Sequence, residues 1–140
     1  MFLSPEIAGV GLNEQQAKAK GMSYKVASVD YSCISRAIAM RNTQGFVKVL
    51  VTDDGQNRLI GMRVIGEHAS SAIQAISLLI SMGKGIEELA ELIHPHPSIT
   101  EGIQECVRVL LGKSMLKPSV LRDIIVYKVY KEGAYHDVTF

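Results

Sequence analysis

The 140-residue sequence has no tryptophan, only two cysteines and four prolines, and no clear excess of charge of either sign. Cys33 and Cys106 lie far apart and form no CxxC pair, which excludes a disulfide-stapled scaffold and a thiolate zinc cluster. We therefore expect two reduced thiols in a cytoplasmic protein. Because 15 basic residues face 14 acidic ones, the net charge is +1 and no field attracts nucleic acid or an anionic membrane.

Long hydrophobic runs are also missing. The apolar stretch around residues 76–80 is interrupted by Ser77 and is far shorter than the roughly 20 residues that cross a bilayer. The amino-terminal residues MFLSPEIAGVGL lack the basic segment of a signal peptide, and Pro5 interrupts the apolar stretch that would follow it. We expect no membrane-spanning segment and no secretory signal.

What is present is the composition of an ordinary globular domain, 47% hydrophobic and 21% charged. A chain of this length buries about two thirds of the surface that its unfolded form exposes, so it folds without disulfides or a structural metal. No repeat or low-complexity linker divides it, and we expect a single domain.

Hydrophobic spacing predicts strands and helices in mixed order. Residues 24–30 alternate as a strand, residues 46–52 and 59–64 form a hairpin around an Asp-Gly turn, and residues 124–140 form a terminal hairpin. Helices are expected over residues 14–20, 69–82, 86–92 and 98–112, whereas residues 35–40 fit a helical turn or a coil. The pattern predicts an α+β fold with helices packed on one face of an antiparallel sheet.

The most unusual stretch is IHPHPSITEGIQE, which holds two of the four histidines. Pro97 lies at the mouth of the helix predicted from residue 98, and Glu101 follows His96 by five residues. A carboxylate bonded to one ring nitrogen would fix the tautomer of His96 and leave its other nitrogen free for proton transfer. His96 and Glu101 would thus be the base and the orienting residue of a catalytic dyad or triad, whose nucleophile the sequence does not show.

Other interpretations of the candidate residues remain open. Ser98 and Glu101 form an S-x-x-E capping box, in which the carboxylate only caps the helix. A metal site of His94, His96 and Glu101 lacks a fourth ligand, so we expect no metal. A G-x-G pair at Gly9 and Gly11 lacks the third glycine of a dinucleotide-binding loop.

The segments FLSPEIAGVGL, EQQAKAKG, GFVKVLV and HPHPSITE, in this order over residues 2 to about 115, resemble the carboxy-terminal dimerisation domain of the pyridine nucleotide-disulfide oxidoreductases. Among these, the paired histidines are most similar to those of the dihydrolipoamide dehydrogenases. The resemblance implies that residues 1–117 are the dimerisation domain and residues 118–140 a carboxy-terminal extension of it. It also implies that His96 is the active-site base, that Glu101 is its partner, and that His94 and Pro97 lie near the flavin or the redox disulfide.

The resemblance further implies a fragment of a FAD- and NAD-dependent homodimeric oxidoreductase, in which this domain contributes the His-Glu pair to the partner subunit. The chain has neither the CxxxxC pair nor the dinucleotide-binding loops, so we expect no cofactor on it and no activity alone. Expected partners are the amino-terminal FAD and NAD domains and a 2-oxo acid dehydrogenase complex. Alternatives are a glutathione reductase-like enzyme and a stand-alone dimerisation or binding module. Three departures from the family are Ile93 in place of cysteine, Ser71 in place of glutamate, and the extension.

Overall fold

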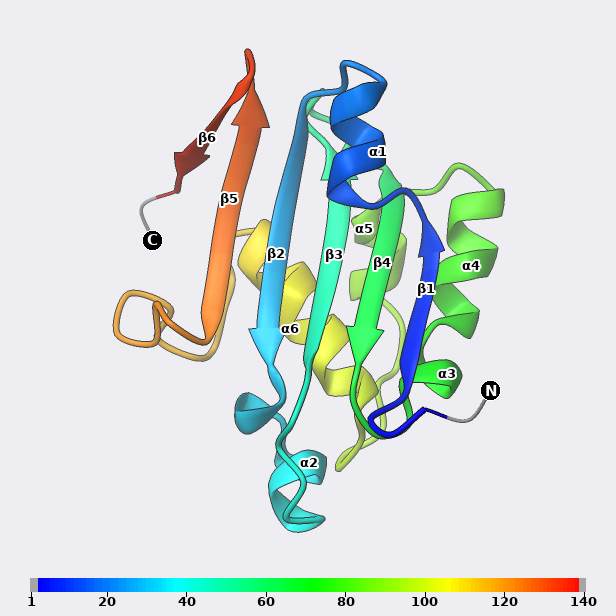
Figure 1. Cartoon of the computed structure of the whole chain (residues 1–140), viewed down its shortest axis with the longest axis vertical. Helices are drawn as coiled ribbons and strands as arrows, with labels where there is room; N and C mark the ends of the chain where they lie inside the picture. The colour runs from blue at the N-terminus through cyan, green and yellow to red at the C-terminus, as the bar shows by residue number, and fades with distance from the viewer. Residues whose placement is uncertain (1–2, 139–140) are drawn as a thin grey trace.

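Six antiparallel strands form the frame of the protein, in the spatial order β1-β4-β3-β2-β5-β6 (Figure 1). The computed structural model describes residues 3–138. The strands are β1 (Ile7–Gly11), β2 (Tyr24–Asp30), β3 (Phe46–Thr52), β4 (Leu59–Ile65), β5 (Ile125–Lys131) and β6 (Ala134–Asp137). The first half of β3 alternates partly exposed residues with buried valines, whereas its second half, from Val49 to Thr52, is buried on both faces. The second buried face belongs to the cluster that contains Leu50, Val26 and Ala17. The predicted β3–β4 hairpin is confirmed.

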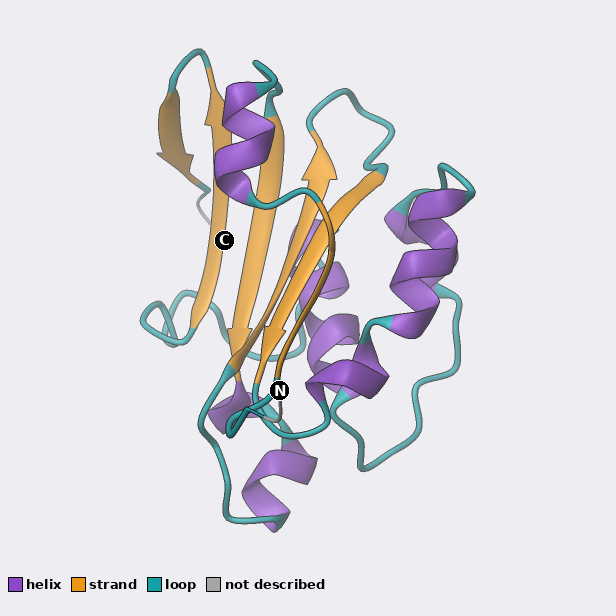
Figure 2. Ribbon diagram, turned by 45° about the vertical axis from the view of Figure 1, so that its right-hand side comes forward, coloured by secondary structure: helices purple, strands orange, loops and turns teal. Residues whose placement is uncertain are grey.

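Helices cover mainly one face of this sheet (Figure 2). The helices are α1 (Glu14–Ala19), α2 (Ser35–Ala39), α3 (Ala69–Ala72), α4 (Gln74–Ser81), α5 (Ile86–Ala90) and α6 (Thr100–Leu110). Helix α6 packs against β2 and β3, and α3 and α4 pack against β1 and β4. The predicted α+β class with an antiparallel sheet is confirmed, but α1 lies across the opposite face, where Ala17 is buried with Leu50 and Val26.

Helix boundaries differ from the prediction at each of the four expected helices, and the one expected over residues 14–20 ends at Ala19. The helix expected over residues 69–82 is divided at Ile73, whose backbone (φ −85°, ψ −9°) tightens the turn between α3 and α4. The helix expected over 98–112 begins at Thr100, because Ile99 is its N-cap. The helix expected over 86–92 ends at Ala90, and residues 35–40, for which a coil was the alternative, contain helix α2.

The terminal hairpin extends the sheet beyond β2. Strand β5 pairs with β2 from Tyr24 to Val29, and the chain returns into β6 through Glu132 and Gly133, which both have positive φ (53° and 82°). This is the backbone that a two-residue hairpin turn needs to follow the twist of its strands. Thr139 and Phe140, which the prediction included in the last strand, lie outside the described residues.

A cluster of tyrosines joins this hairpin to α1. The rings of Tyr24 and Tyr130 stack with centroids 5.2 Å apart, and the hydroxyl groups of Tyr24 and Tyr135 are 3.0 Å apart. Tyr135 also donates a hydrogen bond to Glu14, and the ammonium of Lys18 lies 4.3 Å from the centroid of the Tyr135 ring. The side chain of Tyr135 in β6 therefore links β2 and α1, which are both far from it in sequence.

Removing the hydroxyl of Tyr135 tests how much its hydrogen bonds stabilise the fold. We expect Tyr135→Phe to lower the free energy of unfolding by about 1 kcal/mol, because the hydrogen bonds to Tyr24 and Glu14 are lost. The measurement is urea denaturation followed by circular dichroism. Tyr130→Phe is the matched control, since that tyrosine keeps its ring stack without its hydroxyl. Equal midpoints for the two variants would show that the hydroxyl of Tyr135 contributes nothing.

Gly61 in β4 lies directly against the backbone of Leu12, which leads from β1 to α1. A Cβ atom placed on Gly61 would lie 1.9 Å from the carbonyl oxygen of Leu12. We therefore expect Gly61→Ala to destabilise the protein by about 3 kcal/mol, because backbone must move to relieve the overlap. The comparison variant is Gly21→Ala, where φ is +65° but nothing lies within 4 Å, so that only backbone strain of about 1 kcal/mol applies. Equal losses in thermal denaturation of both variants would contradict the predicted clash.

Candidate functional site

The candidate site lies on the loop between α5 and α6. Two prolines keep this loop out of regular secondary structure from Glu91 to Ser98. The His96–Pro97 peptide bond is cis. Helix α6 then begins at Thr100, anchored on the sheet by Ile103, Cys106 and other buried residues of its inner face. Because α6 is packed on the sheet, its first turn places Glu101 beside the loop that carries His96.

His96 and Glu101 are in direct contact. The Nδ1 atom of His96 lies 2.8 Å from Oε1 of Glu101, and the backbone N–H of Ser98 donates a hydrogen bond of 2.9 Å to the other carboxylate oxygen. The imidazole is 69% exposed, whereas the Glu101 side chain is only 25% exposed. The acid is therefore held from two sides, while the ring remains accessible from solution.

The environment of Glu101 keeps its carboxyl group ionised. Partial burial acts to raise its pKa, but the hydrogen bonds from the Ser98 amide and the His96 ring, with the charges of His96 and Arg108, outweigh burial and lower the pKa. A carboxylate can only accept hydrogen bonds. We therefore assign the proton of the neutral imidazole to Nδ1, which leaves the lone pair of Nε2 free to take up a proton.

Both interpretations of the S-x-x-E pattern hold in part. Glu101 does reach back to the Ser98 amide, as in a capping box. The reciprocal bond is missing, because the hydroxyl of Ser98 pairs instead with that of Thr100 at 2.8 Å. The carboxylate uses one oxygen for the chain and the other for His96, so capping and orienting are not alternatives here.

The other predicted residues lie near this pair but are not bonded to it. His94 is half-buried, with Nε2 at 3.4 Å from the carbonyl oxygen of Leu89, and this long contact points the ring back toward α5. Pro97 is exposed and follows His96 in the loop. Within residues 3–138, no group of three or more His, Cys, Asp or Glu side chains is placed to hold a metal ion.

The glycines near the amino terminus do not form a cradle for a dinucleotide. Gly9 and Gly11 lie in β1, which is paired with β4, and not at the start of a helix. A Cβ on Gly9 would meet the side chain of Arg63 at 2.6 Å, and that side chain donates hydrogen bonds to the carbonyls of Val10 and Gly11. Gly9 and Gly11 therefore do not form the phosphate-binding turn of a dinucleotide-binding fold.

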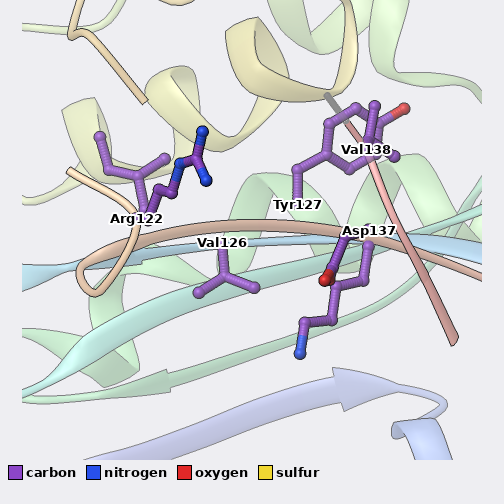
Figure 3. A pocket seen from close by; sticks show the side chains of 7 residues that line it. Arg122, Val126, Tyr127, Asp137 and Val138 are labelled. Carbon is purple, nitrogen blue, oxygen red and sulfur yellow. The ribbon is translucent and has the colours of Figure 1, made fainter. Parts of the chain in front are cut away.

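A hollow of about 360 Å³ lies away from His96, between β5, β6 and the preceding loop (Figure 3). Arg122 and Tyr127 lie on the side of β5 that faces α6, and Val126 lies on the other side. None of the residues that line this hollow belongs to the predicted site. Separately, no helix within residues 3–138 is both long and apolar enough to pass through a membrane.

Comparison with known proteins gives a consistent result. Residues 1–107 match the family described as pyridine nucleotide-disulphide oxidoreductase, dimerisation domain. The chain is 36% identical over 110 residues to a dihydrolipoyl dehydrogenase of Thermus scotoductus and 38% identical over 111 residues to that of Staphylococcus aureus. Each alignment covers 79% of this chain but 24% of the relative, so the chain spans about a quarter of the length of these relatives.

The fold is also found in a solved structure. The crystal structure of LpdA from Mycobacterium tuberculosis superposes with a TM-score of 0.72 at 28% sequence identity, over 78% of this chain and 24% of that one. The family match ends at residue 107, before β5 and β6. The terminal hairpin is therefore outside the part of the chain that the family description covers.

Proposed function

The chain belongs to the dimerisation-domain family of the pyridine nucleotide-disulphide oxidoreductases, and from this premise we propose that it is the interface domain of a dihydrolipoyl dehydrogenase-like flavoenzyme that oxidises a dithiol. The observation that carries the proposal is the 2.8 Å contact between Nδ1 of His96 and the carboxylate of Glu101. It supports His96 as the acid/base group and Glu101 as the residue that orients it.

The chemistry of the pair suits a dithiol substrate. A free thiol has a pKa of about 8.5, and only its thiolate attacks a disulfide. Nε2 of His96 takes the thiol proton, and the resulting imidazolium stabilises the thiolate next to it as an ion pair. Glu101 keeps Nδ1 protonated throughout and stabilises the positive charge on the ring.

The remaining parts of the reaction are proposed to reside outside this chain. FAD and NAD, which would accept the electrons, are assigned to amino-terminal domains of the same protein, because Gly9 and Gly11 form no dinucleotide-binding turn here. A homodimer is supported by the exposure of His96, which is accessible to a disulfide on another chain. A 2-oxo acid dehydrogenase complex is the further partner that we propose.

We propose that residues 1–117 constitute the interface domain and that residues 118–140 extend it as part of the same folded unit. The pairing of β5 along β2 supports one unit. A cytoplasmic location is supported by Cys33 and Cys106, which are both free thiols.

Two measurements test this function. The coding sequence upstream of Met1 should encode a CxxxxC pair and two dinucleotide-binding loops. The full-length protein should then bind flavin and reduce NAD with dihydrolipoamide. Turnover of glutathione disulfide with a reduced nicotinamide cofactor instead would favour a glutathione reductase-like enzyme. Absence of the upstream motifs would favour the stand-alone dimerisation module.

A further inference from the structure

An ion pair with a buried carboxylate lies on α6, close to the candidate site. The side chain of Glu105 is only 8% exposed, and its Oε2 atom lies 3.7 Å from Nη1 of Arg108. Its other oxygen, Oε1, accepts a hydrogen bond from the hydroxyl of Ser114, in the segment that follows α6. A buried carboxylate stays ionised when a cation and a hydrogen-bond donor face it in this way. Two opposite charges are therefore held in place on this helix.

The ion pair shares one face of α6 with the catalytic candidate Glu101. Glu101, Glu105 and Arg108 follow one another at spacings of four and three residues, which places them on the same side of a helix. All three line one hollow of about 240 Å³. Of the charged groups, His96 and Arg108 act most strongly on Glu101, and both lower the pKa of its carboxyl group. The ion pair thus lies within electrostatic reach of the contact between His96 and Glu101.

Other titratable or charged groups lie on the elements next to this part of α6. They are Lys25, Asp30, Cys33, Arg36, Lys48, Glu87, Glu88, Glu91 and His94. The two lysines and Glu88 have ion pairs of their own, and Arg36 lines a separate hollow. Burial, together with the charges of Asp30 and Glu105, raises the pKa of the Cys33 thiol, so this group stays neutral at pH 7.

We propose that Arg108 and Glu105 are positioning residues that set, by their charges, how readily the His96–Glu101 pair takes up a proton. This inference rests on the proposed function, in which that pair accepts the proton of the thiol. Arg108 favours the unprotonated pair, because a nearby cation opposes the uptake of another positive charge. Glu105 has the opposite effect and also holds the guanidinium of Arg108 in place. Both residues act through Glu101 and not on the substrate.

Two members of this network lie outside the part of the chain that the family description covers. The family match ends at residue 107, and both Arg108 and Ser114 follow it. Ser114 bonds Glu105 directly, so the segment after α6 is joined to the ion pair. The proton affinity of the site would therefore depend on residues that are particular to this chain.

The test measures the rate of flavin reduction by dihydrolipoamide against pH in the full-length flavoenzyme. The rate should fall on the acid side as the pair takes up a proton, and the midpoint of this fall belongs to the two coupled groups together. We expect Arg108→Gln to move the midpoint to higher pH by about 0.5 unit, as the loss of a unit charge roughly 10 Å away predicts. Below the midpoint, this shift lowers the rate about threefold. Glu105→Gln removes an anion and should move the midpoint to lower pH by about the same amount.

Three further variants separate charge from packing. Arg108→Lys keeps the positive charge and should leave the midpoint in place. The double variant Arg108→Gln, Glu105→Gln removes both charges, so the two opposite shifts should largely cancel, whereas losses of packing would add. Arg122→Gln removes an exposed arginine from the loop before β5 and should shift nothing.

The outcomes distinguish this inference from the proposed function. An unchanged midpoint in Arg108→Gln would overturn the inference. Equal shifts in Arg108→Gln and Arg108→Lys, or shifts of the same sign in Arg108→Gln and Glu105→Gln, would also overturn it, since distortion of the helix and not charge would then be the cause. In each of these cases the unsubstituted enzyme still oxidises dihydrolipoamide, and the proposed function stands. If the unsubstituted enzyme oxidises no dithiol, the proposed function fails, and this inference fails with it.

Discussion

Replacing His96 by glutamine in the full-length enzyme is expected to slow dithiol oxidation by a factor of about 10² to 10⁴, the usual contribution of a positioned acid/base group. Glutamine can occupy the position and bond Glu101, but it has no group that takes up a proton near neutral pH. The flavin should remain bound, because the exposed ring of His96 supports no part of the core. The decisive measurement is the rate of flavin reduction by dihydrolipoamide in stopped flow, together with the flavin content of the purified variant.

His136→Gln is the matched control for this experiment. His136 is an exposed histidine on β6, in the terminal hairpin and outside the loop that carries His96. Its replacement should leave the rate unchanged. If His96→Gln reduced the flavin as fast as the unsubstituted enzyme, another base would have to serve the dithiol, and the role assigned to this imidazole would be wrong.

Glu101→Gln should lower the rate of flavin reduction by a factor on the order of 10². The reason is that the glutamine side chain has a single oxygen where the carboxylate has two, one for the Ser98 amide and one for the His96 ring. The two partners lie at different oxygens of the carboxylate, so in this arrangement the single amide oxygen can replace only the one that faces Ser98 or the one that faces His96. If the oxygen stays with Ser98, the amide NH₂ faces Nδ1 and favours the tautomer that carries its proton on Nε2. That tautomer has no lone pair at the atom that must accept the thiol proton.

The pH profile distinguishes this effect from a loss of folding. Because the pKa of Glu101 is lowered in the folded protein, the carboxylate stabilises the fold above its unfolded pKa, and this contribution is lost as the pH falls through the folded value. At neutral pH the unsubstituted pair is therefore intact. Glu101→Gln should lower the rate at pH 7 while the dimer and the flavin are retained. Glu91→Gln, at an exposed glutamate that follows α5, should leave both rate and pH profile unchanged.

The sheet and the His96–Glu101 contact were predictable from sequence, because both depend on local spacing. Val47, Val49 and Val51 at alternate positions of β3 indicate a strand without any knowledge of the fold. A histidine five residues before a glutamate, with Pro97 between them, brings the two side chains together once a helix begins just after the proline. Locally encoded features of this kind survive errors of one or two residues at the helix ends.

Features that depend on tertiary packing could not be predicted in this way. The division of the helix at Ile73 is made by a turn that sequence spacing does not reveal. On the opposite face, α1 packs Ala17 against Leu50 and bonds Glu14 to Tyr135, and both contacts join residues far apart in sequence. His68 has a positive φ of 63°, for which its sequence neighbours give no signal.

The pairing of β5 with β2 also limits how copies of this protein can associate. A free strand edge offers unpaired amides to any passing chain, and natural sheets protect such edges. Here the long edge of β2 is already occupied, so backbone-to-backbone growth is confined to β1 and to the four-residue β6. Two copies that meet elsewhere must recognise each other through side chains, whose chemistry, unlike that of the peptide backbone, discriminates between partners.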